Sequence, residues 1–354
     1  MHILMLVNWK INHLEKEDVT IQSPDKLIKG QKYWFCKYFP DNIKVDVMDF
    51  SKIPLIHHIE KRFLKFYIVQ AFKAFIKRKK YDLILSHSAQ SAVFFAFLRS
   101  VIGEKLPLHI VIDPASFNGG RDNFFELIPI KFATRSISGL IYHATIQSQY
   151  YEKHLPNLAK RARYIPFGID VDFFAPINLP VENYVVAFGY KKRDYNTLFN
   201  AWQKLMPKDI DLNVIGVKKK KFHKILNCIP KVNFHEFVPI NVLKEIIAKS
   251  LFVILPLPYY EYSYGQMSLL QSMCMGKAVI VTRTPGITDY IKDGINALGV
   301  NPYDADDLAD KIKKCLSDRQ LIDEVGKQAR LSVLKKFSEQ IMADKIFSYI
   351  KEIL

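Results

Sequence analysis

The stretch LFVILPLPYYEYSYGQMSLLQSMCMGKAVIV, Leu251 to Val281, indicates the fold of this chain more directly than any other part of it. Its first residues, Leu251 to Leu255, form a short apolar run that is typical of a buried parallel strand. The prolines and aromatic residues that follow favour a loop. Gly265 then opens an apolar helix, Gly276 closes it, and a second apolar strand follows at 278–281. Because a helix start leaves backbone N–H groups unpaired, we expect this one to bind a phosphate.

Length and composition predict a globular chain with two domains. The 354 residues are 49% hydrophobic and 24% charged, a composition that suits a folded chain too long for one typical core. Strand and helix patterns alternate along both halves, which predicts an α/β fold with parallel, doubly wound sheets. We predict a first domain over 1–175, a second over 181–335 and an amphipathic helix over 336–354, with the proline-bearing segment 176–180 as a linker.

The first half carries the clearest alternation of elements. Apolar runs predict strands at 2–7, 45–48, 83–86, 108–112, 140–143 and 164–165. Helical spacing predicts helices at 31–39, 58–79 and 89–102.

Cysteine usage and hydropathy narrow the cellular setting. Cys36, Cys228, Cys274 and Cys315 lie far apart and form no CxxC or Cys/His pattern, so neither a disulfide framework nor a zinc site is predicted. A reduced cytosolic compartment is the simple expectation. The N-terminus is predicted to be a strand and not a signal peptide, and no segment approaches the roughly 18 apolar residues that span a bilayer.

The 251–281 stretch resembles the donor-binding segment of the retaining glycosyltransferases of family four, the glycosyl transferases group 1. That family shows Glu-Gly-Phe-Gly, a short apolar run, and then Leu-Glu-Ala-Met-Ala-x-Gly; the spacing is kept here, with Ser263 and Gln271 in place of the two glutamates. The similarity continues through YIPFGIDVDFF at 164–174, VVAFGYKKRDYNTLFNA at 185–201 and TPGITDY at 284–290. It implies the GT-B fold, in which two Rossmann-like domains face a cleft and the last helix returns to the first domain.

The resemblance further implies a nucleotide diphosphate sugar as the donor. Its leaving group departs with negative charge, which cations or N–H dipoles must stabilise. Arg193 stands where the family carries a lysine, and Gln271 can accept a hydrogen bond from a ribose hydroxyl through its amide oxygen. The residues that we predict to contact the donor are Gly30, Gly189, Arg193, Gly216, Val238, Ser263, Gly265, Gln266, Met267, Ser268, Leu269 and Gln271.

Two residues of the first half are candidates for the acceptor side. His87 and Asp113 each follow a predicted strand, and ligands of open α/β sheets bind at that edge. Asp113 could orient an acceptor hydroxyl or take its proton. A hydrogen-bonded structural histidine and a turn aspartate are the alternative interpretations.

We predict no metal and no cofactor beyond the sugar nucleotide. Asp-x-Asp triplets occur at 170–172, 209–211 and 304–306. The first belongs to the segment between the domains, the second precedes a strand, and the third starts a helix, where aspartate is a common cap.

A net charge of +16 predicts an anionic partner. The predicted helix within 60–80 carries an apolar stripe, and Lys61, Lys65, Lys73 and Lys77 fall on another face. Such a helix can lie on an anionic membrane, although an ordinary solvated surface helix has the same pattern. No nucleic-acid-binding motif occurs. We therefore expect a cytoplasmic protein peripheral to the inner membrane face, without a nucleic-acid partner.

The predicted function is transfer of a sugar, with retention, to a hydroxyl of a lipid-linked or cell-surface glycan. Two other classes stay open. A sugar-nucleotide epimerase shares the fold, but should carry paired carboxylates in the cleft. A non-catalytic nucleotide- or glycan-binding protein is compatible with the uncharged residues Ser263 and Gln271.

Overall fold

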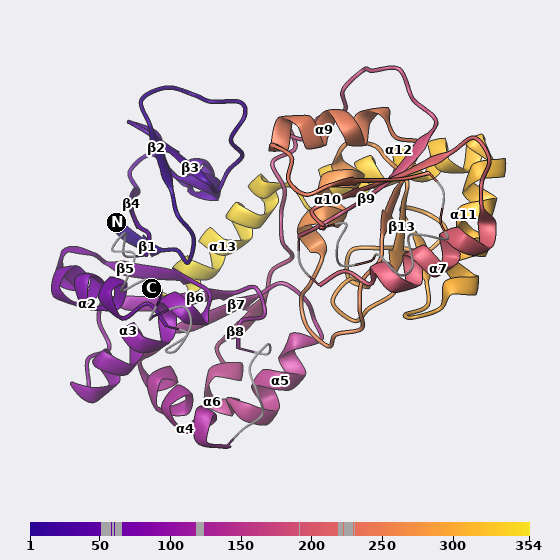
Figure 1. Cartoon of the computed structure of the whole chain (residues 1–354). Helices are drawn as coiled ribbons and strands as arrows, with labels where there is room; N and C mark the ends of the chain where they lie inside the picture. The colour runs from indigo at the N-terminus through magenta and orange to yellow at the C-terminus, as the bar shows by residue number, and fades with distance from the viewer. Residues whose placement is uncertain are drawn as a thin grey trace.

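The computed structural model describes residues 1–50, 58, 60, 66–117, 124–190, 192–218, 222, 229 and 231–354. Figure 1 shows two α/β halves, each built around a parallel sheet, with the last helix returning to the first half. The predicted fold class is confirmed.

The first sheet has six parallel strands in the order β4-β1-β5-β6-β7-β8. All six strands predicted for the first half are present, with ends shifted by one or two residues. They are β1 (His2–Leu6), β4 (Lys44–Met48), β5 (Leu83–His87), β6 (Leu108–Asp113), β7 (Gly139–Tyr142) and β8 (Ala162–Tyr164). A small separate sheet of β2 (Asn12–Leu14) and β3 (Lys26–Ile28) had no counterpart in the prediction.

Successive side chains of β1 point to opposite faces of this sheet. Ile3 and Met5 join the core under η1 (Trp34–Tyr38) and α13 (Glu339–Ile353), whereas Leu4 and Leu6 pack against α2 (Ile68–Lys77). The second face also carries α3 (Ala89–Val101), α4 (Phe124–Ala133), α5 (Gln147–His154) and α6 (Pro156–Ala159).

Two of the predicted helices differ from the prediction. The segment 31–39 forms only the short 3-10 helix η1. The helix predicted over 58–79 is α-helical at Ile68–Lys77, and most of the segment before Phe66 lies outside the described residues. Lys61 and Lys65 lie outside the described residues. The structure therefore does not test their predicted place on a membrane-facing helix.

The second sheet repeats the scheme in the order β11-β10-β9-β12-β13-β14. One face packs on α9, α10 and α12, and the other on α7 and α11. The strands are β9 (Tyr184–Phe188), β10 (Asp211–Ile215), β11 (Val232–His235), β12 (Val253–Leu255), β13 (Val279–Thr282) and β14 (Leu298–Val300), and the helices are α7 (Tyr195–Leu205), α9 (Ile240–Lys249), α10 (Gln266–Cys274), α11 (Ala305–Ser317) and α12 (Arg319–Lys336).

The chain crosses between the halves twice, and the two crossings lie side by side. Ile169, on the outgoing segment, forms a parallel bridge with Ser338 on the returning one. The Ile169 N–H donates to the Phe337 carbonyl at 2.9 Å, and the Glu339 N–H donates to the Ile169 carbonyl at 2.8 Å. Helix α13 then packs on the first sheet through Met342, Ile346 and Ile350.

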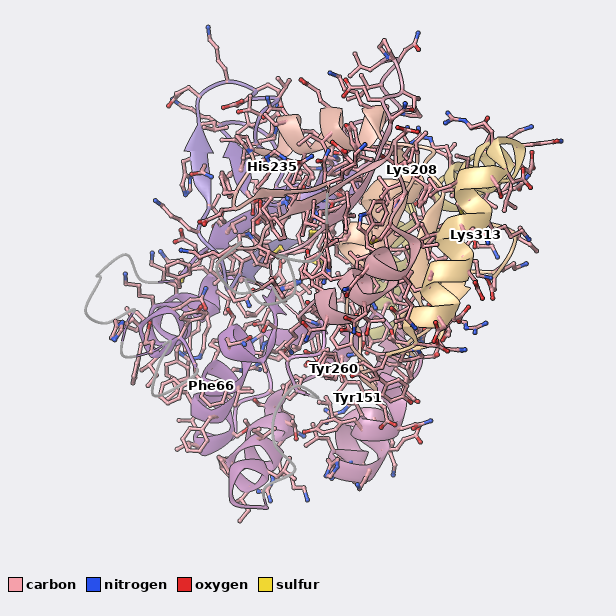
Figure 2. The ribbon with its side chains drawn as sticks, turned by 45° about the vertical axis from the view of Figure 1, so that its right-hand side comes forward. Phe66, Tyr151, Lys208, His235, Tyr260 and Lys313 are labelled. Carbon is pink, nitrogen blue, oxygen red and sulfur yellow. The ribbon has the colours of Figure 1, made fainter. Side chains whose placement is uncertain are left out.

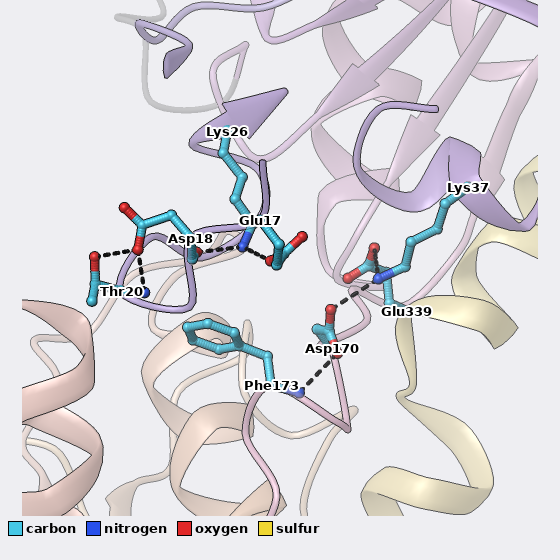
Figure 3. Close-up of polar contacts among 8 residues, drawn as sticks. All are labelled: Glu17, Asp18, Thr20, Lys26, Lys37, Asp170, Phe173 and Glu339. Carbon is cyan, nitrogen blue, oxygen red and sulfur yellow. Dashed lines mark hydrogen bonds and ion pairs between the residues drawn. The ribbon is translucent and has the colours of Figure 1, made fainter. Parts of the chain in front are cut away.

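A lysine and two carboxylates meet at these crossings. In Figure 3, Lys37 of η1 points between Asp170 and Glu339, at 2.9 and 3.6 Å from their oxygens. Burial raises the pKa of Glu339 to about 7, since Lys37 only partly offsets the burial and Asp170 adds repulsion. The same view shows Lys26 bonded to Glu17 and to the Asp18 carbonyl, beside the Phe173 ring.

This raised pKa predicts that Glu339→Gln stabilises the protein at high pH. The folded state keeps the Glu339 proton up to about pH 7, whereas the ordinary pKa is 4.5, so stability falls as pH rises through that window. Glutamine removes this loss, and we expect a gain of roughly 3 kcal/mol at pH 8 and almost none at pH 4. Urea titrations at both pH values measure it, with the exposed Glu245→Gln as control. An equal effect at both pH values would contradict the raised pKa.

Candidate functional site

The start of α10 has the geometry of an anion site. Gly265 precedes it in the left-handed region at φ +87°, and a Cβ there would lie 2.8 Å from a Leu257 methyl carbon, so only glycine fits without strain. Among the described residues no side chain caps this helix. The first-turn N–H groups, at Gln266, Met267 and Ser268, have no intrahelical acceptor and are free to bind an anion.

Arg193 lies beside this helix start. Its Nη2 donates to the Ser268 hydroxyl at 2.8 Å, its Nη1 to the Tyr264 hydroxyl at 3.0 Å, and its Nε to the Phe188 carbonyl at 3.1 Å. The guanidinium therefore joins the end of β9 to the first turn of α10. A charge held in place next to helix N–H groups is what a diphosphate requires.

Two glycines make room for this arrangement. Gly189 follows β9 at φ +143°, and a Cβ there would lie 2.5 Å from the Arg193 guanidinium carbon. Gly216 follows β10 at φ +91°, and its Cβ would lie 2.9 Å from the Gly189 carbonyl carbon. The ends of both strands thus approach closely, as the predicted donor contacts at these two glycines require.

A second cation, next to Arg193 in the sequence, is held among tyrosine rings that the sequence analysis did not select. Lys192 Nζ lies 4.9, 5.1 and 5.6 Å from the ring centres of Tyr260, Tyr262 and Tyr264, and donates to the Tyr262 hydroxyl at 2.8 Å. Tyr260 and Tyr262 stack on each other at 4.7 Å. The aromatic-rich loop before Gly265 was the available signal, because tyrosine faces attract cations.

Gln266 and Gln271 tie the helix to other parts of the molecule. Gln266 Nε2 donates to the Gly286 carbonyl at 2.6 Å, which fixes the helix start to the loop after β13. Gln271 Nε2 donates to Gln22 Oε1 in the first half at 3.3 Å. The predicted ribose acceptor thus lies where the two halves meet, with its own amide oxygen still available as an acceptor.

The other residues predicted to contact the donor differ in how exposed their side chains are. Met267 is 42% exposed and, with Gln22, lines a small cavity of about 10 Å³, room for about one water molecule. Ser263 is buried at the end of the tyrosine-rich loop. The Val238 carbonyl accepts from the Tyr190 hydroxyl at 3.4 Å.

An exposed aromatic pair lies next to the strand-end glycines. Tyr190 is 54% and Phe237 is 73% exposed, and their rings lie 6.0 Å apart. The sequence analysis selected neither, although an exposed aromatic ring offers a face on which a planar base can stack.

The structure contradicts the donor contact predicted for Leu269. Its side chain is fully buried in the second core, and its N–H already donates to the Gly265 carbonyl at 3.1 Å. Gly30 occupies an open turn after β3, and none of the described contacts joins it to Arg193 or α10. The prediction for Leu269 failed because motif spacing does not determine which groups of a helix stay accessible, whereas the donor contact at Gly30 stays a prediction.

His87 lies at the C-terminal end of β5, under two tryptophan rings. Trp9 and Trp34 lie 4.7 and 5.8 Å from its ring. Burial and the nearby His143 lower the pKa of His87 to about 3, so its imidazole is neutral at physiological pH. Its Nδ1 has no hydrogen-bond partner among the described residues. An imidazole with so low a pKa is a weak base, but it can donate or accept a hydrogen bond.

Asp113 has a structural place, which corrects its predicted catalytic role. Its side chain has no exposed surface. The carboxylate accepts from the Ser116 N–H and the Tyr151 hydroxyl, each at 2.6 Å, and also from the Ser116 hydroxyl. Burial raises its pKa despite these bonds. A carboxylate enclosed in this way stabilises the loop after β6 and cannot reach an acceptor.

The described residues offer neither a metal-ligand cluster nor a membrane-spanning helix. No group of three or more His, Cys, Asp or Glu side chains suited to a metal ion was found within the described ranges. No described helix combines the length and apolar character needed to cross a bilayer.

A match to a known family lies in the second half of the chain. The family model for glycosyl transferases group 1 matches residues 182–318. This stretch contains the strand-end glycines, Arg193 and α10. The resemblance to glycosyl transferases group 1 that the sequence predicted is confirmed.

Curated relatives that match part of this chain are glycosyltransferases. Alpha-D-kanosaminyltransferase of Streptomyces kanamyceticus is 25% identical over 119 residues, 34% of this chain and 29% of the relative. The capsular polysaccharide biosynthesis glycosyltransferase CapM of Staphylococcus aureus is 29% identical over 91 residues, 26% of this chain and 24% of the relative. The chain thus spans less than a third of these relatives' length.

Solved structures share the fold along the whole chain. Sucrose-phosphate synthase of Thermosynechococcus elongatus matches with a TM-score of 0.72 and 14% identity over 100% of this chain and 99% of its own. Anabaena HepE, solved with UDP and glucose, matches with a TM-score of 0.71 and 14% identity over 99% of this chain and 100% of its own. The chain thus shares the fold of these structures, and residues 182–318 match the model for glycosyl transferases group 1.

Proposed function

We propose that this protein transfers a sugar, with retention of its anomeric configuration, from a nucleotide diphosphate sugar to a hydroxyl of a lipid-linked or cell-surface glycan. The observation that carries the proposal is Arg193, fixed by Ser268 and Tyr264 beside the uncapped start of α10. The name of CapM, a capsular polysaccharide glycosyltransferase, supports a glycan acceptor. The sugar nucleotide in a HepE structure, UDP-glucose, supports the donor class.

In the proposed reaction the bond between the anomeric carbon and the diphosphate oxygen breaks. The acceptor oxygen forms the new bond on the same face of the sugar, and its proton passes to the departing phosphate oxygen. Arg193, Lys192 and the N–H groups of α10 would stabilise the charge that develops on the diphosphate. This arrangement assigns no step to a side-chain base, which suits the low pKa of His87 and the enclosed Asp113.

A thermal-shift panel of nucleotide diphosphate sugars, free nucleoside diphosphates and nucleosides tests the donor assignment. A bound donor at 100 times its dissociation constant should add about 2.7 kcal/mol of stability. Release of nucleoside diphosphate from the stabilising donor, measured with a glycan acceptor, then tests transfer. Stabilisation by none of the sugar nucleotides would refute the proposal.

A non-catalytic binding protein is the second candidate. Ser263 and Gln271, uncharged where the family has glutamates, favour it. Donor stabilisation without any release of nucleoside diphosphate across acceptors would select this candidate.

Transfer is expected to survive excess chelator. Arg193, Lys192 and the helix start supply positive charge at the proposed leaving group, so this proposal needs no divalent ion there. Donor turnover measured with and without EDTA should agree within about twofold. Complete loss in EDTA, restored by Mg²⁺ or Mn²⁺, would show that a metal carries the charge.

We also propose that the protein acts in the cytoplasm, at the inner face of a membrane that holds its acceptor. The net charge of +16 supports an anionic surface as a partner.

A further inference from the structure

The outer sides of α2, α3 and α4 form a continuous apolar surface, which we call the three-helix face. Aromatic rings connect the helices in sequence: Phe72 contacts Phe94 at 5.6 Å, Phe94 contacts Phe97 at 6.3 Å, and Phe97 contacts Phe132 at 5.5 Å. These rings show that the outward faces of all three helices adjoin. In Figure 1 the three helices lie on the side of the first half that is remote from the second sheet.

Large apolar side chains extend from this face into solvent. On α2, Phe72 and Ile76 are 46% and 76% exposed. Val101, at the end of α3, and Leu106, in the loop after it, are 61% and 67% exposed, and Ile128 of α4 is 49% exposed. Exposed aliphatic and aromatic side chains gathered on adjoining helices mark an interaction surface, because leaving them in water is unfavourable.

The three helices and the turns that follow them also carry positive charge. Their exposed basic residues are Lys73, Lys77, Lys79, Lys80, Lys105, Lys131 and Arg135. Neither α2 nor α3 contains an acidic residue. Glu104, in the loop after α3, is already paired with Arg78, and this pair attaches that loop to the end of α2.

We propose that the three-helix face docks on an anionic lipid bilayer. The apolar side chains would enter the boundary between headgroups and acyl chains, while the exposed basic side chains would contact the headgroups. A second copy of the chain fits less well, because a symmetric contact would place one set of lysines against an identical set. This inference locates the proposed membrane association on a surface that includes residues of α3 and α4, which the sequence analysis did not select. It can fail without affecting the sugar-transfer proposal, since its test uses no donor.

The test is sedimentation of the full chain with vesicles of phosphatidylcholine alone, or of phosphatidylcholine and phosphatidylglycerol in equal parts. The unmodified protein should bind only the anionic vesicles. Raising the salt concentration should weaken this binding without abolishing it, because salt screens the lysines and leaves apolar insertion intact. Binding to neutral vesicles only, or to neither kind, would overturn the proposal.

Two variants separate the apolar and the charged contributions. Ile76→Ser with Leu106→Ser should weaken binding on the order of tenfold or more. Lys77→Gln, Lys80→Gln and Lys105→Gln together should weaken it about a hundredfold, roughly fivefold for each lysine. All five side chains are exposed, so thermal midpoints should stay unchanged.

Matched controls change the same chemistry elsewhere. Val19→Ser with Ile295→Ser removes side chains that are 71% and 53% exposed. Lys313→Gln, Lys314→Gln and Lys327→Gln lower the net charge equally from α11 and α12. Figure 2 shows Lys313 on the opposite side of the molecule from Phe66, which lies just before α2. If the lysine variants of the face and of the control lost equal affinity, only net charge would matter and the assignment would be overturned. It would also be overturned if the protein formed a dimer without vesicles and Ile76→Ser with Leu106→Ser dissociated that dimer.

Discussion

Replacing Arg193 with alanine is expected to weaken binding of nucleoside diphosphates by about 1.5–3 kcal/mol and to leave nucleoside binding nearly unchanged. The guanidinium lies within 2.8 Å of Ser268, on the first turn of α10, so it contacts the part of the site that a diphosphate would occupy. Truncation removes a charge-assisted contact, whereas the base and ribose bind elsewhere. Isothermal titration with the two ligand classes measures the difference.

Two further substitutions refine this experiment. Arg193→Lys keeps the charge but cannot bridge Ser268 and Tyr264 at once, so its loss should be intermediate. Lys313→Ala removes a remote, exposed cation and should bind diphosphates like the parent. Because Arg193 also bonds the Phe188 carbonyl, the thermal midpoint of each variant shows whether the site is still folded. Equal losses for diphosphates and nucleosides would remove Arg193 from the diphosphate site.

Gly168→Ala is expected to destabilise the protein by about 3 kcal/mol or more. A Cβ at Gly168 would lie 2.5 Å from the Ser338 carbonyl oxygen and 2.9 Å from Glu339 Cα, where the two crossings pair. These atoms are backbone and are held by the hydrogen bonds between Ile169 and the returning segment, so they cannot move aside alone. Denaturant titration measures the loss.

Gly103→Ala is the control for this prediction. Gly103 lies in an open turn at φ +70°, with nothing within 4 Å of an added Cβ. Alanine there should cost only about 1 kcal/mol, through backbone conformation. If Gly168→Ala were no worse than this control, the two crossings would not be held as closely as the structure places them.

The strand and helix pattern was readable because local properties determine it. The first-half strands are continuous apolar runs, as both faces of a parallel sheet are buried, and each predicted strand lies within two residues of its observed position. Gly265 also carried its own signal, since a left-handed residue before a helix strongly favours glycine. Where periodicity was the only guide, boundaries failed: the segment 31–39 contains only a 3-10 turn.

The site was predictable only in part, because motif spacing places residues along the chain and not their surroundings. Arg193 was selected from the sequence, whereas its partners Tyr264 and Ser268 come from a loop and a helix far along the chain. The ring of tyrosines around Lys192 was missed for the same reason. Asp113 was selected for its position after a strand, but Tyr151, 38 residues later, encloses it.

By itself, the sequence determined the strands of the first parallel sheet, the alternation of strand and helix, and the glycine that opens α10, since each depends on neighbouring residues or on the apolar pattern. Only the tertiary structure decided which polar groups stay accessible, because burial depends on segments that are distant in sequence. Thus Leu269 faces the core, Glu339 shares Lys37 with Asp170, and Ile76 and Leu106 stay exposed.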